Sequence, residues 1–107
     1  MTSCVNNAMR YYRRVLRSFR DKDTQAVWER RRSRKLDPVT QRAALRKLAI
    51  LDAAETLGDL LIPPGNRLEE LSGDRGGQHS IRINRQWRIC FRWSDAGPQD
   101  VEIVDYH

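Results

Sequence analysis

The chain has 107 residues, of which 39% are hydrophobic and 32% charged. This length suits one domain around a single core, and no apolar stretch approaches the roughly 20 residues that span a bilayer. The first 19 residues contain four arginines, at positions 10, 13, 14 and 17, and lack the apolar centre of a secretory signal. We therefore expect a cytoplasmic protein that does not enter a membrane.

The formal net charge is +6, and the basic residues are dominated by arginine. Only three of the 20 basic residues are lysine, so 17 are arginine. Arginine binds phosphate with two parallel donors and stacks on bases, which favours a polyanionic partner such as RNA. High genomic GC content also enriches arginine without any functional cause, and composition alone leaves both explanations open.

The cysteines and histidines do not form a metal-binding pattern. Cys4 and Cys90 lie far apart, and only His79 and His107 are available to join them as ligands. We expect no metal site and no cofactor, with Cys90 as a core thiol.

The N-terminal third predicts an extension, a short strand and a helix. Residues 1–14 show no clean hydrophobic period and are interpreted as an extension that is a candidate for disorder, so the domain is expected to span residues 15–107. Residues 15–19 resemble a short strand. Asp21 and Asp23 supply capping chemistry for a helix that runs to about Arg34. The basic residues 30–32, 34 and 35 either complement the negative end of that helix or contact RNA.

A second helix is predicted to start at Asp37-Pro38, since aspartate caps well and proline is tolerated at the first helical position. Its apolar residues recur with helical spacing on one face, as far as about Glu55. This face consists of Ala44, Leu45, Leu48 and Leu51. Residues 57–61 then form a turn or a short helical piece, and after the break at residues 63–65 everything is interpreted as β-structure.

Three strands are predicted in the C-terminal third, because side chains alternate there with a period of two. Strands over residues 80–84 and 87–93 are joined tightly through residues 84–86, and a looser hairpin over residues 94–98 leads to a last strand over residues 100–106. The predicted core side contains Ile81, Ile83, Trp87, Ile89, Phe91, Trp93, Val101 and Ile103, and the opposite face contains Arg82, Arg88, Arg92 and Tyr106. The order β-α-α-β-β-β predicts an α+β fold, with two helices on one side of a small antiparallel-rich sheet and a basic opposite face.

A basic sheet face that ends in Tyr106 and His107 contains the groups needed to cleave RNA without a metal. That reaction requires a base for the 2′-hydroxyl proton, cations for the phosphorane, and an acid for the leaving 5′-oxygen. Histidine, with an unperturbed pKa of about 6.5, suits either proton transfer. Arg88 and Arg75 are candidates for binding phosphate, and Tyr106 for stacking on a base. A terminal histidine is, however, more often an ordinary surface residue.

Several motifs from residue 15 to 107 together resemble the HigB branch of the RelE-type toxins, within the RelE/ParE superfamily. The matching segments are Leu16-Arg17-Ser18-Phe19, Leu71-Ser72-Gly73-Asp74-Arg75, Ser80-Ile81-Arg82-Ile83-Asn84, Gln86-Trp87-Arg88-Ile89 and Val104-Asp105-Tyr106-His107. The resemblance implies a RelE-like fold and a site formed by the strand arginine Arg88 and the terminal cluster Asp105, Tyr106 and His107. Asp105 alternates toward the core side, so it is better placed to orient its neighbours than to meet substrate.

The resemblance also marks two departures, since members of the family often carry histidine and lysine where this chain has Glu69 and Ser72. Glu69 is either a replacement general base or an exposed strand residue. Ser72 removes a cation that Arg67 or Arg75 can replace. The expected site therefore has Arg88, Asp105, Tyr106, His107 and Glu69 in catalysis, and Arg67, Ser72, Arg75, Arg82 and Arg92 along the RNA.

By the same resemblance, the chain is expected to be the toxin of a type II toxin-antitoxin pair, a metal-independent endoribonuclease that cleaves mRNA on the ribosome. Its implied partners are a HigA-like helix-turn-helix antitoxin, the ribosome and mRNA, with operator DNA bound only through the antitoxin. Two alternatives remain: a non-catalytic RNA-binding module, and a degenerate member that retains only antitoxin binding.

Overall fold

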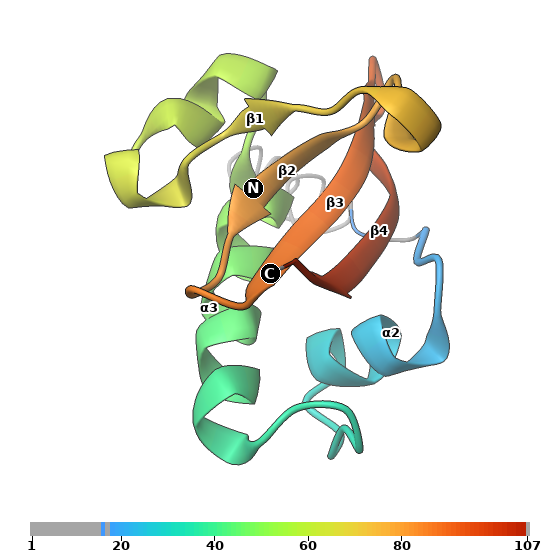
Figure 1. Cartoon of the computed structure of the whole chain (residues 1–107), viewed down its shortest axis with the longest axis vertical. Coiled ribbons are helices and arrows are strands. Elements are labelled where there is room, and N and C mark those ends of the chain that lie inside the picture. The colour runs from blue at the N-terminus through green and yellow to red at the C-terminus, as the bar shows by residue number, and fades with distance from the viewer. Residues whose placement is uncertain (1–15, 17, 107) are drawn as a thin grey trace, which may run out of the picture.

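The computed structural model describes residue 16 and residues 18–106, so the predicted extension over residues 1–14 lies outside the described residues. Two helices pack against one face of an antiparallel sheet in the order β1-β2-β3-β4, which confirms the predicted α+β class (Figure 1). None of the helices in the described part of the chain is long and apolar enough to cross a membrane. The elements are α2 (Lys22–Trp28), α3 (Pro38–Ala53), the 3-10 turns Leu57–Leu61, Pro64–Asn66 and Gly73–Arg75, β1 (Glu69–Glu70), β2 (His79–Arg82), β3 (Trp87–Ser94) and β4 (Gly97–Asp105).

The first predicted helix is shorter than expected. Asp21 caps α2 by accepting a hydrogen bond from the Thr24 amide at 2.9 Å, but the helix ends at Trp28, and the prediction that it runs to Arg34 is wrong. Arg30 adopts a left-handed conformation with φ 61°, and the Arg31 amide donates to the Ala26 carbonyl at 2.8 Å. These are the features of a Schellman motif, which normally places glycine where this chain has Arg30.

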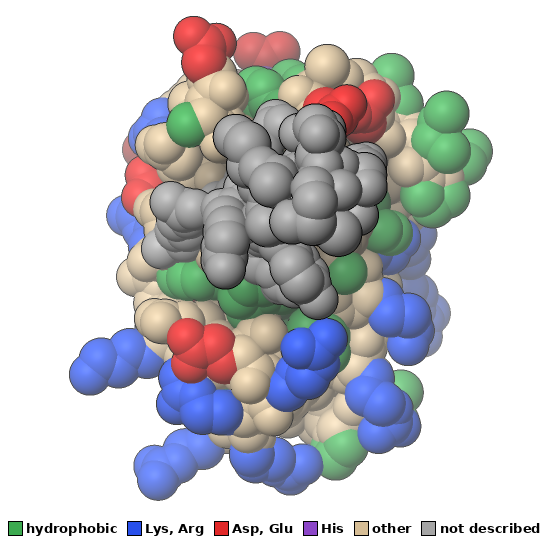
Figure 2. All heavy atoms as spheres, turned by 180° about the vertical axis from the view of Figure 1, so that it is seen from behind, with side chains coloured by type: hydrophobic (Ala, Val, Ile, Leu, Met, Phe, Trp, Pro, Cys, Tyr) green, Lys and Arg blue, Asp and Glu red, His purple; other side chains and the backbone are tan. Residues whose placement is uncertain are grey.

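The basic run therefore lies in the connection between α2 and α3 rather than on a helix. The side chains of Arg30, Arg31, Arg32 and Arg34 are exposed there. Viewed from behind, Lys and Arg side chains gather over the lower part of the molecule (Figure 2). The interpretation that these residues complement a helix dipole is wrong, because the helix has already ended at Trp28.

The second helix is close to its prediction. Asp37 accepts a hydrogen bond from the Thr40 amide at 2.7 Å, and Pro38 occupies the first helical position. The helix ends at Ala53, two residues before the predicted end. Its buried residues are Ala44, Leu48 and Leu51, which confirms the amphipathic face.

The strands confirm the predicted alternation. Ile81 pairs with Ile89, which pairs with Ile103, and all three are at most 1% exposed beneath the helices. Ser94 pairs with Gly97, so the predicted loose hairpin is a tight two-residue turn. The prediction that everything after residue 65 is β-structure is wrong at the turn Gly73–Arg75.

The predicted first strand is reduced to a single bridge in the described residues. Phe19 bridges Val101 of β4 in parallel, and the flanking Ser18 carbonyl and Arg20 amide bond to Val101. This contact lies beside β4, the strand at the opposite edge of the sheet from β1.

Candidate active site

The outer face of the sheet, opposite the helices, is organised around a buried arginine. Arg88 on β3 is only 7% exposed. Its Nε donates to the Ser80 Oγ on β2 at 2.8 Å, and its Nη2 donates to the backbone carbonyl of Arg67 at 2.5 Å. A buried charge is tolerated only when its hydrogen-bonding groups are satisfied. These contacts hold the guanidinium at one position and in one orientation.

Glu69 and Tyr106 approach the same guanidinium from two sides. The carboxylate of Glu69, on β1, lies 3.5 Å from Arg88 Nη2. The ring of Tyr106, directly after β4, lies with its centroid 5.6 Å from the Arg88 Cζ, within cation–π range. The Tyr106 amide donates to the Gln86 carbonyl at 2.6 Å, which ties the end of β4 to the β2–β3 loop. Three residues far apart in sequence thus meet at one point.

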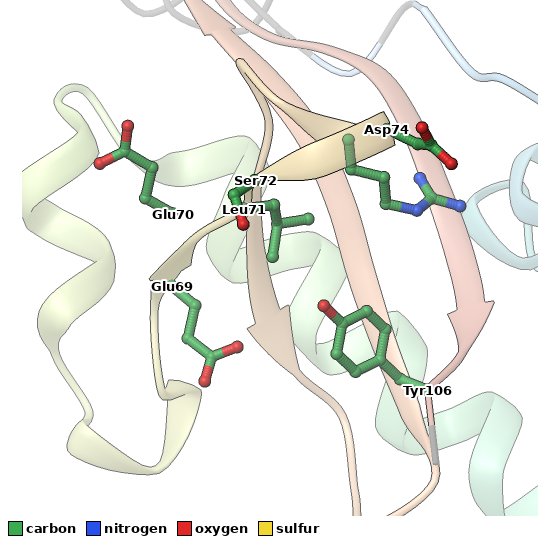
Figure 3. A pocket seen from close by; sticks show the side chains of 7 residues that line it. Glu69, Glu70, Leu71, Ser72, Asp74 and Tyr106 are labelled. Atoms are coloured by element: carbon green, nitrogen blue, oxygen red, sulfur yellow. The ribbon is translucent and has the colours of Figure 1, made fainter.

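An open pocket of about 520 Å³ lies beside this cluster. The Glu69 carboxylate and the Tyr106 hydroxyl point toward one another across it, whereas Glu70 points away (Figure 3). Its walls are formed by Glu69, Glu70, Leu71, Ser72, Asp74, Arg75 and Tyr106. A tyrosine face beside a buried cation suits a nucleotide, whose base stacks while its phosphate meets the charge.

Arg75 stands on the other side of the pocket with a partner of its own. Its Nη1 donates to Gln78 at 3.1 Å and to the Glu102 carboxylate at 3.2 Å. Glu102 also lies 3.9 Å from the Arg20 Nε. The charge of Arg75 is therefore partly neutralised before any ligand arrives.

Cys90 is buried on β3, as the sequence predicted. Burial raises the pKa of its thiol, with the nearby Arg75 acting in the opposite direction. It therefore remains a protonated thiol rather than a nucleophile at neutral pH.

The remaining predicted RNA-binding residues are spread more widely. Arg82 donates from Nε to the Asn84 carbonyl at 3.0 Å, and Arg92 is an exposed residue 3.8 Å from Asp100. The Arg67 side chain is exposed, and its backbone is left-handed, with φ 46°. Its carbonyl accepts the hydrogen bond from Arg88 Nη2. Ser72 lines the pocket.

The terminal cluster is only partly described. Asp105 pairs with Trp87 across the sheet, yet its side chain is exposed and accepts from Gln86 Nε2 at 3.1 Å. It therefore contacts a neighbour at the rim of the sheet. His107 lies outside the described residues, directly after Tyr106.

The outer sheet face is mixed in charge, and the prediction that it is simply basic is wrong. Glu69 and Glu102 lie among the arginines on this face and pair with Arg88 and Arg75. Strand alternation did predict that Arg88 and Tyr106 share a face, and their stacking confirms it. The sequence reasoning did not identify Ser80, although it lies two residues before Arg82 on the same strand face.

Comparisons with known proteins agree with this fold. Residues 17–107 match the model of a family described as the RelE-like toxin of type II toxin-antitoxin system HigB. The chain is 46% identical over 79 residues to Toxin HigB-1 of Vibrio cholerae, covering 73% of this chain and 83% of that protein. It is 34% identical over 65 residues to Endoribonuclease HigB of Proteus vulgaris, covering 57% of this chain and 65% of that protein. An uncharacterized protein of Haemophilus influenzae is 38% identical over 50 residues, which cover 47% of this chain and 50% of that protein. The chain therefore belongs to the HigB family of RelE-like toxins, and is the toxin component of a type II toxin-antitoxin system.

Proposed function

We propose that this toxin is a metal-independent endoribonuclease that cleaves mRNA on the ribosome. The observation that carries the proposal is the meeting of Arg88, Tyr106 and Glu69 beside an open pocket. The name of the Proteus vulgaris relative, an endoribonuclease, supports the reaction class. The cluster contains a fixed cation and a stacking surface, and His107 follows it directly in the sequence.

In the proposed reaction, the 2′-oxygen of one nucleotide attacks the adjacent phosphorus while a base accepts the 2′-hydroxyl proton. The bond from phosphorus to the 5′-oxygen then breaks, and an acid gives that oxygen a proton, leaving a 2′,3′-cyclic phosphate and a 5′-hydroxyl. Arg88 stabilises the negative charge that builds on the phosphorane. Glu69 is the candidate base, because it lines the pocket and stays close to the cation. His107 is the candidate acid.

Asp105 and the outlying arginines have supporting roles in this proposal. Asp105 orients the chain end through its contact with Gln86. Arg75, Arg82 and Arg92 line the path of the RNA backbone, together with Ser72 in the pocket wall and Arg67, whose carbonyl contacts Arg88. The ribosome supplies the remaining orientation of the substrate, because holding reactants in place can replace much of the machinery that a free ribonuclease needs.

The partners follow from the same proposal. A type II toxin has an antitoxin, which we propose to be a HigA-like helix-turn-helix protein that alone contacts operator DNA. The toxin itself is proposed to meet the ribosome and mRNA.

The proposal is tested by inducing the toxin in cells without its antitoxin and mapping mRNA 5′ ends. New ends within translated codons are expected, and growth arrest with unchanged ends would overturn the proposal. His107→Ala is expected to reduce cleavage by about 10²- to 10⁴-fold, the usual contribution of a general acid. The matched control is His79→Phe, which removes the other imidazole while preserving the ring contact with Phe91.

A degenerate toxin that retains only antitoxin binding is the second candidate. It is favoured by the composition of the pocket lining, which includes three acidic residues, Glu69, Glu70 and Asp74, and a single arginine, Arg75. Such a lining repels a phosphate backbone unless Arg88 outweighs it. A protein of this kind would cause no growth arrest when it is expressed without its antitoxin.

A further inference from the structure

The buried hydroxyl of Ser80 contacts Arg88, the one charged residue of the site that is buried among the residues that the structure describes. Ser80 is 0% exposed and lies on β2, opposite Cys90 of β3. Its Oγ accepts from Arg88 Nε at 2.8 Å, and its backbone carbonyl lies 3.4 Å from Arg88 Nη2. A side chain and its own main chain therefore both face the same guanidinium.

Within the part of the chain that the structure describes, these contacts engage two of the three guanidinium nitrogens, Nε and Nη2. Nε and Nη2 are engaged by Ser80 and by the Arg67 carbonyl, with Glu69 beside Nη2. Among the described residues, none accepts a hydrogen bond from Nη1. Because the guanidinium is planar, fixing Nε and Nη2 also fixes the direction of the two Nη1 donors.

We infer that Ser80 is a positioning residue, which orients the Arg88 guanidinium so that Nη1 points at a phosphate oxygen of the RNA. The inference rests on the proposed function, in which Arg88 stabilises the phosphorane. Ser80 itself does not touch the substrate, since its side chain is buried beneath Arg88. Its contribution is to remove the rotations that would let the arginine leave the reacting phosphate.

The orientation matters more in the transition state than in substrate binding. A mobile arginine still attracts a phosphate by its charge, but donors fixed in advance act where negative charge develops and need no reorganisation during the reaction. Loss of the Ser80 hydroxyl is therefore expected to lower kcat and to leave KM nearly unchanged.

The test compares Ser80→Ala, Ser80→Thr and Arg88→Ala in cleavage of mRNA bound to programmed ribosomes, with the ribosomal complex as the varied substrate. Ser80→Ala is expected to lower kcat about 10-fold, as the loss of a hydrogen bond to a charged group implies, with KM within about threefold. Ser80→Thr, which retains a hydroxyl, restores kcat. The inference would be overturned if Ser80→Ala had an unchanged kcat, or if its loss of activity came entirely from a higher KM.

A matched control separates positioning from a general loss of structure. Thr24 is also 0% exposed, and its hydroxyl accepts from the Ile103 amide at 2.9 Å on the helix side of the sheet. Thr24→Val therefore removes a buried hydroxyl of the same kind, and kcat per folded molecule is expected to stay at the wild-type value. An equal fall in kcat in Thr24→Val and Ser80→Ala would reduce Ser80 to a structural role.

A spectroscopic measurement decides the matter if the extra methyl of Ser80→Thr prevents folding. In protein labelled with ¹⁵N-arginine, the Arg88 Nε–H is expected to exchange slowly with solvent in the wild type and in Thr24→Val, and rapidly in Ser80→Ala. Unchanged exchange in Ser80→Ala would refute the inference. The proposed function is tested separately: it fails if Arg88→Ala cleaves mRNA at the wild-type rate.

Discussion

Replacing Arg88 by lysine keeps the positive charge of the site and removes the planar group that carries it. An ammonium cannot donate to the Ser80 hydroxyl and the Arg67 carbonyl with the geometry of Nε and Nη2, which bond at 2.8 and 2.5 Å. Each hydrogen bond to a charged group contributes about 1.5 to 3 kcal/mol. Because the shorter ammonium keeps one of the two, we expect Arg88→Lys to lower the free energy of unfolding by about 2 kcal/mol.

This loss of stability corresponds to a fall in Tm of about 8 to 16 °C for a domain of this size. The effect on cleavage is larger, about 10²- to 10³-fold, as for removal of one preorganised donor from a transition state. Thermal unfolding followed by circular dichroism gives the first value. Ribosome-dependent cleavage, measured well below both melting temperatures, gives the second.

Arg92→Lys is the matched control for stability. Its guanidinium is about half exposed and lies 3.8 Å from Asp100, and exposed ion pairs contribute at most about 1 kcal/mol. A Tm close to the wild-type value is expected for this variant. The reasoning is refuted if Arg88→Lys cleaves at the wild-type rate, because a point charge would then suffice without a fixed guanidinium.

Two further predictions concern a backbone contact and a helix cap. Arg67→Gly keeps the left-handed backbone, which glycine adopts readily, and so preserves the carbonyl that accepts the hydrogen bond from Arg88. Cleavage near the wild-type rate would show that Arg67 acts through its backbone. A loss of more than tenfold would show that it acts through its side chain. Hydrogen bonds from Thr40 hold the pKa of the Asp37 carboxyl below its ordinary value. Its contribution to stability is therefore fully present above that ordinary value and is lost as the pH falls through the lowered one. The Tm of Asp37→Ala is therefore expected to lie below that of the wild type at pH 7 and to approach it at low pH. Asp37→Asn, which caps without ionising, is expected to keep a Tm near that of the wild type at pH 7. A difference in Tm between Asp37→Ala and the wild type that does not change with pH would contradict this prediction.

Strand alternation was enough to predict most of the sheet. Ile81, Ile89 and Ile103 are buried on the predicted face, because a period of two assigns each side chain to one face whatever the strand order. The start of α3 was equally local, since Asp37 and Pro38 cap a helix through their own atoms. These features depend on neighbours within a few residues.

The end of α2 was not predictable in the same way. A run of arginines is compatible with both a helix terminus and a loop, because arginine has a good helix propensity. Only the packed chain shows Arg30 in a left-handed conformation that ends the helix after Trp28. The cost of that conformation is offset in part by the hydrogen bonds that the Arg30 and Arg31 amides donate to the Val27 and Ala26 carbonyls.

The sequence by itself determined the fold class and the pairing of Arg88 with Tyr106 on one face. Tertiary structure alone decided what surrounds the arginine. Ser80, the Arg67 carbonyl and Glu69 reach it from β2, from a left-handed residue 21 positions away and from β1. Hydrogen bonds depend on distance and direction in space, and burial sets how strongly each is needed. A residue pattern can therefore predict which face a charge occupies, whereas only the folded chain shows which groups hold it.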